Sequence, residues 1–325
     1  MRVSGPLNNP TTNDPAIVVR GLSHRYPRAA REALSGIDLS IARGSCFGLL
    51  GPNGAGKSTL ISLMTGMIAP QSGEILVEGV SAAADPRALR RAGALAPQDF
   101  AFYPALSGAD NLAFFAGLYR IPKADWPARR AAAVAATQLE DWLDRPAETY
   151  SGGLKRRLNL AIALINAPRI LYLDEPTVGI DARSRQTILE AIKALKAQGV
   201  TIVYTSHYME EVEQLCDAVA VIDHGRLVLQ GRTADLLTEA AARRLTVTLA
   251  APATAKAKAA LQALSPDWST EGKVDLDLAS QADLPAVLEK LQAAGLGVAR
   301  AEYGVSRLET LYLGLLDQAA AESAA

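Results

Sequence analysis

One glycine-rich segment has residue types and spacing that suit phosphate binding. It reads Gly51, Pro52, Asn53, Gly54, Ala55, Gly56, Lys57 and Ser58, and Thr59 follows. Glycines let the backbone turn closely, so that several N–H groups aim at one anion. Lys57 is expected to reach the β- and γ-phosphates of a nucleotide, and the Ser58 hydroxyl to ligate Mg²⁺. A helix from Thr59 onward would point its positive end at the same phosphates.

Two acidic residues follow an apolar run and could complete a hydrolytic site. Asp174 and Glu175 come directly after residues 170–173, Ile-Leu-Tyr-Leu, which suit a buried strand. Ligands of open α/β sheets bind at the carboxyl ends of strands, so both acids would face the phosphate-binding loop. Asp174 is expected to hold Mg²⁺, and Glu175 to orient and deprotonate the attacking water. The turn at Pro176 would re-aim Glu175 toward that water.

The segments around these residues predict an α/β core. From residue 17 to about residue 232, short apolar runs alternate with amphipathic helices and with glycine or proline turns. The runs at 46–50, 170–173 and 201–205 suit strands of a parallel sheet that is buried on both faces. The phosphate-binding loop would then follow one inner strand, and the two acids another.

A mostly helical segment, from Ser107 to Ile165, interrupts this core. Ser107 with Asp110 fits a capping box at the start of a helix. Apolar residues then recur at helical spacing, at Leu112, Phe115, Ala116 and Tyr119. This face is expected to pack internally. A second, alanine-rich helix is expected over residues 128–139.

Beyond Gly231 the pattern changes to that of a small α+β domain. Strands are expected at 245–249, 274–278 and 298–302, and helices at 254–264, 284–293 and 306–316. The chain therefore divides into a flexible tail over residues 1–15, an α/β domain over 16–240 with its helical subdomain at about 100–165, and an α+β domain over 241–325.

The composition limits the kinds of partner. Of 325 residues, 49% are hydrophobic, and the formal net charge is −1. This balance provides no broadly basic face, so no nucleic-acid partner is expected. Cys46 and Cys216 lie in apolar stretches and are expected to be buried free thiols in a reducing compartment. No run approaches the roughly 18 apolar residues of a membrane span, so a membrane role would come through a partner.

Residues 150–157 indicate the protein family. They read Tyr-Ser-Gly-Gly-Leu-Lys-Arg-Arg, which resembles the Leu-Ser-Gly-Gly-Gln signature of ABC ATPases. The resemblance covers residues 17 to about 232 and implies a P-loop NTPase core. Ser151 can cap the helix that follows, while Gly152 and Gly153 allow close backbone approach. In this family that helix N-terminus meets the γ-phosphate bound by a second copy, which implies a head-to-tail dimer.

Four further positions match the family residue by residue. Tyr26 resembles the aromatic residue that stacks on adenine. Gln98 resembles the glutamine that senses both Mg²⁺ and the membrane partner. Asp181 resembles the acid of the loop that communicates across the dimer, and His207 the histidine that contacts the γ-phosphate. The resemblance thus implies catalytic roles for Gln98 and His207 beside Glu175.

The chain departs from the family pattern at a few positions. Tyr150 and Leu154 replace the usual leucine and glutamine of the signature, and residues 179–180, Gly-Ile, stand where Ala-Leu is common. The phosphate contacts of the signature serine and glycine would survive, but the contact of Leu154 with nucleotide is in doubt. His24 and His224 match no family residue and are expected on the surface or in turns.

Less specific resemblances indicate one branch of the family. Residues 176–181, 206–211 and 306–312 are similar to those of single-domain ATPases from drug, polysaccharide and lipid exporters. This implies an exporter subunit that hydrolyses ATP with Mg²⁺, works with separate transmembrane permease subunits and lies peripherally at the cytoplasmic face of the cell membrane. Two alternatives stay open: an importer motor with a C-terminal regulator, and a soluble ABC ATPase that acts on ribosomes or nucleic acid. The single phosphate-binding loop argues against the translation factors of the family, which carry two.

Overall fold

The computed structural model describes residues 15–241, 244–264, 266–268, 272–278, 281–303, 308 and 311–312. The chain forms two compact units that divide after Arg232. The predicted boundary, after residue 240, lies at the other end of α8 (Thr233–Ala241) and stays a prediction. The predicted tail over 1–15 and the predicted helix over 306–316 fall almost wholly outside the described residues. No described helix is both long and apolar enough to cross a membrane.

Six strands form the main sheet of the first unit, in the order β10-β9-β3-β8-β7-β6. They are β3 (Cys46–Leu50), β6 (Gly93–Ala96), β7 (Ile170–Asp174), β8 (Thr201–Thr205), β9 (Ala218–Asp223) and β10 (Arg226–Arg232). Neighbours pair in parallel except β9 with β10. β3, β7 and β8 are buried at every residue. The three predicted apolar strands are therefore confirmed as inner strands of a mostly parallel sheet.

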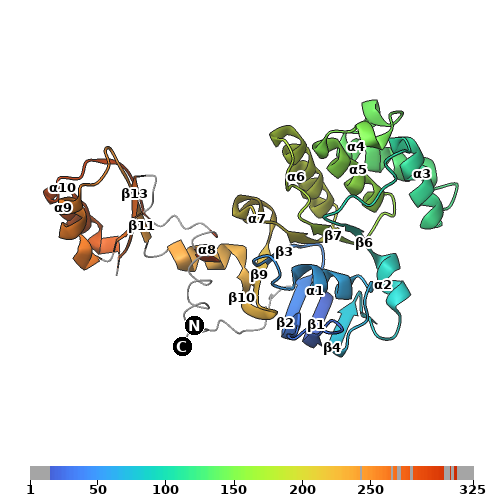
Figure 1. The fold of residues 1–325 in the computed structure, drawn as a ribbon, viewed down its shortest axis with the longest axis horizontal. Helices are drawn as coiled ribbons and strands as arrows, with labels where there is room; N and C mark the ends of the chain where they lie inside the picture. The colour runs from blue at the N-terminus through green and yellow to red at the C-terminus, as the bar shows by residue number, and fades with distance from the viewer. Residues whose placement is uncertain are drawn as a thin grey trace. The chain divides into compact units, whose positions relative to one another are not determined.

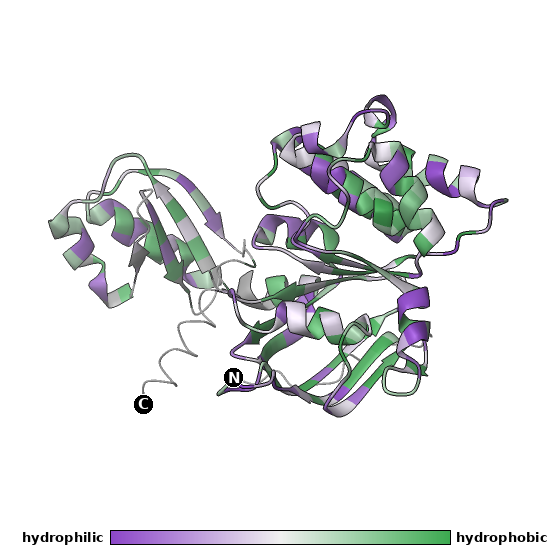
Figure 2. Cartoon of the chain, turned by 45° about the vertical axis from the view of Figure 1, so that its right-hand side comes forward, coloured by the Kyte–Doolittle hydropathy of each residue, from purple (hydrophilic) through white to green (hydrophobic). Residues whose placement is uncertain are grey.

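A second sheet, which the sequence patterns did not predict, is antiparallel and has the order β2-β1-β4-β5. Its strands are β1 (Pro15–His24), β2 (Leu34–Ala42), β4 (Ser72–Val77) and β5 (Val80–Ser81). Helix α1 (Lys57–Met64) packs between the two sheets, since Leu60 and Met64 share one core with Ile17 of β1 and Phe47 of β3. Figure 2 shows many hydrophobic (green) residues along the strands of the first unit. The loop that precedes α1 is thus anchored from both sides.

Helices cover the other side of the main sheet (Figure 1). They are α3 (Gly108–Leu118), α4 (Trp126–Thr137), α5 (Gly152–Leu164) and α6 (Ala182–Ala197). The first unit also contains two shorter helices, α2 (Pro86–Ala92) and α7 (Met209–Leu215). Ser107 caps α3, accepting a hydrogen bond from the Asp110 N–H at 3.1 Å. Leu112 is buried as predicted, but Tyr119 is 36% exposed. The prediction that the whole apolar face packs internally is therefore wrong at its outer end, where Tyr119 follows the 62% exposed Leu118.

The second unit contains a four-stranded antiparallel sheet in the order β12-β13-β11-β14. Its elements are β11 (Arg244–Leu249), α9 (Ala255–Ala260), β12 (Asp267–Trp268), β13 (Lys273–Asp277), α10 (Leu284–Ala293) and β14 (Val298–Tyr303). This β-α-β-β-α-β order with that strand arrangement is ferredoxin-like. Val247, Val274 and Leu291 lie in its core. The predicted alternation of strands and helices is confirmed for these elements.

Candidate active site

The phosphate-binding loop, residues 51–58, joins the end of β3 to α1 and needs glycine at two places. A Cβ at Gly51 would lie 2.2 Å from the carbonyl oxygen of Ile222, and a Cβ at Gly56 would lie 2.6 Å from that of Ala33. Gly56 also has a φ of 112° and caps α1 without a side chain. The first N–H groups of α1 therefore have no side-chain cap, which is the arrangement that receives phosphate at a helix N-terminus.

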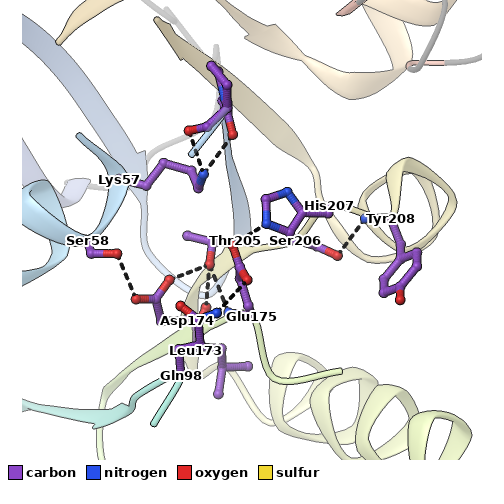
Figure 3. Close-up of polar contacts among 12 residues, drawn as sticks. Lys57, Ser58, Gln98, Leu173, Asp174, Glu175, Thr205, Ser206, His207 and Tyr208 are labelled. Carbon is purple, nitrogen blue, oxygen red and sulfur yellow. Dashed lines mark hydrogen bonds and ion pairs between the residues drawn. The ribbon is translucent and has the colours of Figure 1, made fainter. Parts of the chain in front are cut away.

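Lys57 lies inside this loop. Its Nζ donates hydrogen bonds to the carbonyl oxygens of Gly51 at 2.7 Å and of Pro52 at 3.1 Å (Figure 3). The side chain is buried, and burial lowers the pKa of Lys57, while the nearby Glu175 and Asp174 carboxylates act against that shift. The loop thus carries a buried positive charge where the glycine-rich motif predicts the β- and γ-phosphates.

Ser58 and Asp174, predicted to ligate Mg²⁺, are brought together from distant parts of the chain. Ser58 Oγ donates to Asp174 Oδ2 at 3.0 Å, and Thr205 Oγ1 donates to Asp174 Oδ1 at 2.8 Å (Figure 3). A hydroxyl and a carboxylate are oxygen ligands of the kind that Mg²⁺ prefers. The donor set therefore fits the predicted ion.

Glu175 is the centre of a second group of predicted residues. Its Oε1 lies 2.6 Å from His207 Nε2, and its Oε2 accepts a hydrogen bond from Gln98 Nε2 at 3.1 Å (Figure 3). The Glu175 backbone has a φ of 50°, and its N–H donates to Thr205 Oγ1 at 2.9 Å. This left-handed conformation, uncommon for a residue other than glycine, turns the carboxylate out of the strand's alternation. The change of direction that the sequence predicted at the Pro176 turn therefore occurs at Glu175 itself.

Thr205 is a site residue that the sequence patterns did not single out. Its hydroxyl bonds both the Asp174 carboxylate and the Glu175 backbone, so it fixes the two acids relative to each other. One signal was present, because Thr205 ends a predicted strand two residues before His207.

The signature residues form a separate cluster with Asp181. Ser151 caps α5 through the Leu154 N–H at 3.3 Å, and Asp181 caps α6 through the Ser184 N–H at 2.9 Å. Hydrogen bonds from Ser184 lower the pKa of Asp181. Ser151 and Gly152 are exposed. No hydrogen bond between described residues joins this cluster to Lys57, Asp174 or Glu175.

Gly153 has a packing role inside the chain. A Cβ there would lie 2.0 Å from Ser184 Oγ and 2.6 Å from Asp181 Oδ2. The two departures from the signature are also internal, since Tyr150 and Leu154 are both buried. Leucine at position 154 thus faces the protein core, which accounts for the loss of a polar side chain there.

Tyr26 lies at the edge of the phosphate-binding loop. Its hydroxyl is 3.3 Å from Thr59 Oγ1, and its ring stands edge-on to His24 with 5.0 Å between centroids. His24 is buried, so the expectation that it lies on the surface or in a turn is wrong, because its ring packs beside Tyr26 at the end of β1. His224 is exposed as expected.

Comparison with known proteins agrees with this geometry. The family model described as ABC transporter matches residues 34–178. The chain is 43% identical over 203 residues to the linearmycin resistance ATP-binding protein LnrL of Bacillus subtilis, covering 62% of this chain and 65% of LnrL. It is 37% identical over 238 residues to the Nod factor export ATP-binding protein I of Ralstonia nicotianae, covering 73% of this chain and 74% of that protein. The chain belongs to the ABC transporter ATP-binding proteins.

A solved structure supports the same assignment. CbiO1 from Clostridium perfringens, part of an ABC transporter complex, is 31% identical with a TM-score of 0.63, covering 70% of this chain and 92% of cbiO1. The chain of the present structure, as a member of this family, binds ATP and is an ATPase. The α/β fold class with a P-loop NTPase core is confirmed.

Proposed function

We propose that this ABC protein drives export across a membrane, with Glu175 as the base that activates water. The observation that carries the site assignment is the Glu175 carboxylate, held between Gln98 and His207 beside the Ser58–Asp174 pair. A carboxylate fixed on both oxygens can align one water and accept its proton. Lys57 and the N–H groups of α1 would bind the phosphates.

Mg²⁺ is part of this proposal. Ser58, Asp174 and Gln98 would hold the ion, which when bound neutralises the charge that develops on the phosphates. Asp174 is already oriented by two hydroxyl donors, so little rearrangement is needed to present its oxygens.

A second copy completes the site in this proposal. The N-terminus of α5 presents the exposed Ser151 and Gly152 outward, without contact to the chain's own phosphate-binding loop among the described hydrogen bonds. A helix N-terminus of this kind suits the γ-phosphate held by another copy. Two copies arranged head to tail would bury two nucleotides between them.

The membrane subunits would dock beside Gln98. Phe100, Tyr103, Phe114 and Leu118 are exposed apolar side chains, and the Tyr103 and Phe114 rings are 4.7 Å apart. Arg156 lies 4.9 Å from the Phe100 ring and donates to the Gln98 carbonyl oxygen. Exposed apolar side chains of this kind would form an interaction surface, and Arg156 connects one of them, Phe100, to the segment that carries Gln98.

The direction of transport is proposed from the relatives. One is named for linearmycin resistance and another for Nod factor export. The protein would act peripherally at the cytoplasmic face of the cell membrane, as the absence of a spanning helix among its described residues allows.

Two measurements test the proposal. Glu175→Gln is expected to bind ATP normally and to lower kcat by about 10²–10⁴-fold, since a general base is lost. Normal turnover would refute the base assignment.

Tagged protein from detergent-solubilised membranes should carry a stoichiometric polytopic membrane protein, identified by mass spectrometry, and Phe114→Ser should release it. Recovery of ribosomes or nucleic acid instead would refute the transport role, and uptake rather than efflux in vesicles would make the protein an importer motor.

A further inference from the structure

Glu211, on α7, is a buried carboxylate that the ATPase site described above does not include. It is 1% exposed and accepts four hydrogen bonds from side chains. The donors to Oε2 are the hydroxyls of Tyr204 at 2.5 Å, Ser206 at 2.7 Å and Thr177 at 2.9 Å, and the donor to Oε1 is Arg185 Nε at 2.6 Å. Both carboxylate oxygens are therefore occupied by groups of this chain.

Three of the four donors come from the segments that carry the reacting groups. Thr177 lies two residues after Glu175, and Ser206 directly precedes His207. Tyr204 precedes Thr205, the residue that bonds both site acids. Arg185 belongs to α6, which Asp181 caps. One carboxylate thus joins the loop after β7, the end of β8 and the start of α6.

The residues on either side of His207, Ser206 and Tyr208, are both connected to Glu211. The Ser206 hydroxyl donates to Glu211 and accepts from the Tyr208 N–H at 3.0 Å. Arg185 donates to the same carboxylate and lies 4.4 Å from the centroid of the Tyr208 ring. Both neighbours of His207 are therefore fixed with respect to Glu211.

We propose that Glu211 is a positioning residue for ATP hydrolysis. It holds the loop after β7, which carries Glu175, and the segment after β8, which carries His207, in fixed positions so that these two side chains stay paired. The proposal rests on the ATPase activity and on the role of Glu175. None of the hydrogen bonds of Glu211 with described residues reaches a predicted phosphate or magnesium ligand, so its effect would pass through the 2.6 Å Glu175–His207 contact.

The arrangement favours a carboxylate, which accepts at both oxygens and donates at neither. Burial, and next the Glu211 charge, raise the pKa of Tyr204 well above its usual value, so the phenol keeps its proton and donates. An amide at position 211 would turn its NH₂ either toward the three hydroxyls or toward the Arg185 N–H. In the first orientation the hydroxyls must accept instead of donate, so their own protons lose the oxygen at position 211, and in the second orientation two N–H donors face each other. Glu211→Gln therefore disturbs the network while keeping its shape.

The test compares Glu211→Gln with Glu190→Gln, which makes the same change on an exposed glutamate of α6. Glu211→Gln is expected to lower kcat by about tenfold to 100-fold, as a misplaced catalytic group does, with KM and the dissociation constant of ATP within about twofold of the wild type. Glu190→Gln should leave all three unchanged. Unchanged kcat in a folded Glu211→Gln protein, or a loss confined to KM, would overturn the proposal.

A double-mutant cycle separates positioning from general damage. If Glu211 acts through the Glu175–His207 pair, its replacement should lower kcat little in a Glu175→Gln background. The same fold-loss in both backgrounds would overturn the proposal. Absence of hydrolysis in the wild type would instead contradict the ATPase assignment.

Milder variants keep the test decisive if Glu211→Gln fails to fold. Thr177→Val and Tyr204→Phe each delete one donor without leaving a buried charge unpaired. Each should lower kcat several-fold at unchanged ATP affinity, and wild-type kcat in both would overturn the proposal.

Discussion

Replacing Gly153 by alanine should destabilise the protein even in the absence of ATP and of a second copy. The added Cβ would lie 2.0 Å from Ser184 Oγ and 2.4 Å from Ser184 Cβ. A hydroxyl can rotate away, but a Cβ is fixed to its backbone, so the N-terminal turns of α5 and α6 must separate. Overpacking of this kind costs roughly 1–3 kcal/mol.

The neighbouring glycine provides a matched control with the opposite sign. A Cβ at Gly152 would meet its nearest atom, the Gly179 carbonyl oxygen, at 3.7 Å, which is ordinary contact. Gly152 has no positive φ and begins α5, so Gly152→Ala should be neutral or stabilising by up to about 1 kcal/mol.

Thermal unfolding of the nucleotide-free proteins distinguishes the two variants. A cost of 1 kcal/mol lowers Tm by about 2–4 °C in a domain of 150–250 residues, so Gly153→Ala should unfold several degrees below Gly152→Ala. Equal Tm values would refute the reasoning and leave contact with nucleotide as the reason for glycine at position 153.

Three further predictions follow from buried polar groups and thiols. Thr205→Val should raise the Mg²⁺ concentration for half-maximal hydrolysis about tenfold, because Asp174 loses a hydroxyl donor; an unchanged Mg²⁺ titration would contradict this. Asn159→Ala should cost roughly 1–3 kcal/mol in urea denaturation, since its buried amide bonds two backbone groups of the loop before α3. Cys46 and Cys216 are buried with their sulfurs 3.6 Å apart, and burial raises the pKa of the Cys216 thiol. A thiol reagent should therefore label both slowly until the protein is unfolded.

The sequence by itself determined the features that depend on neighbouring residues. The phosphate-binding loop, the inner strands β3, β7 and β8, and the cap of α3 each arise from residue types at short spacing. Local rules of this kind apply because glycine conformation, strand burial and helix capping are decided within a few residues. Roles for Gln98 and His207 at the site were implied only by the family resemblance, and their contacts with Glu175 became visible in the structure.

Only the tertiary structure decided which distant residues meet. The sheet β2-β1-β4-β5 depends on the pairing of β1 with β4, which brings Ile17 opposite Val77 across a long stretch of chain and which no local pattern reports. The roles of Thr205 and Glu211 depend on hydroxyls and carboxylates from separate strands and helices converging in a buried place. A buried polar group must find partners wherever the fold brings them, so its importance becomes visible only when the chain is packed.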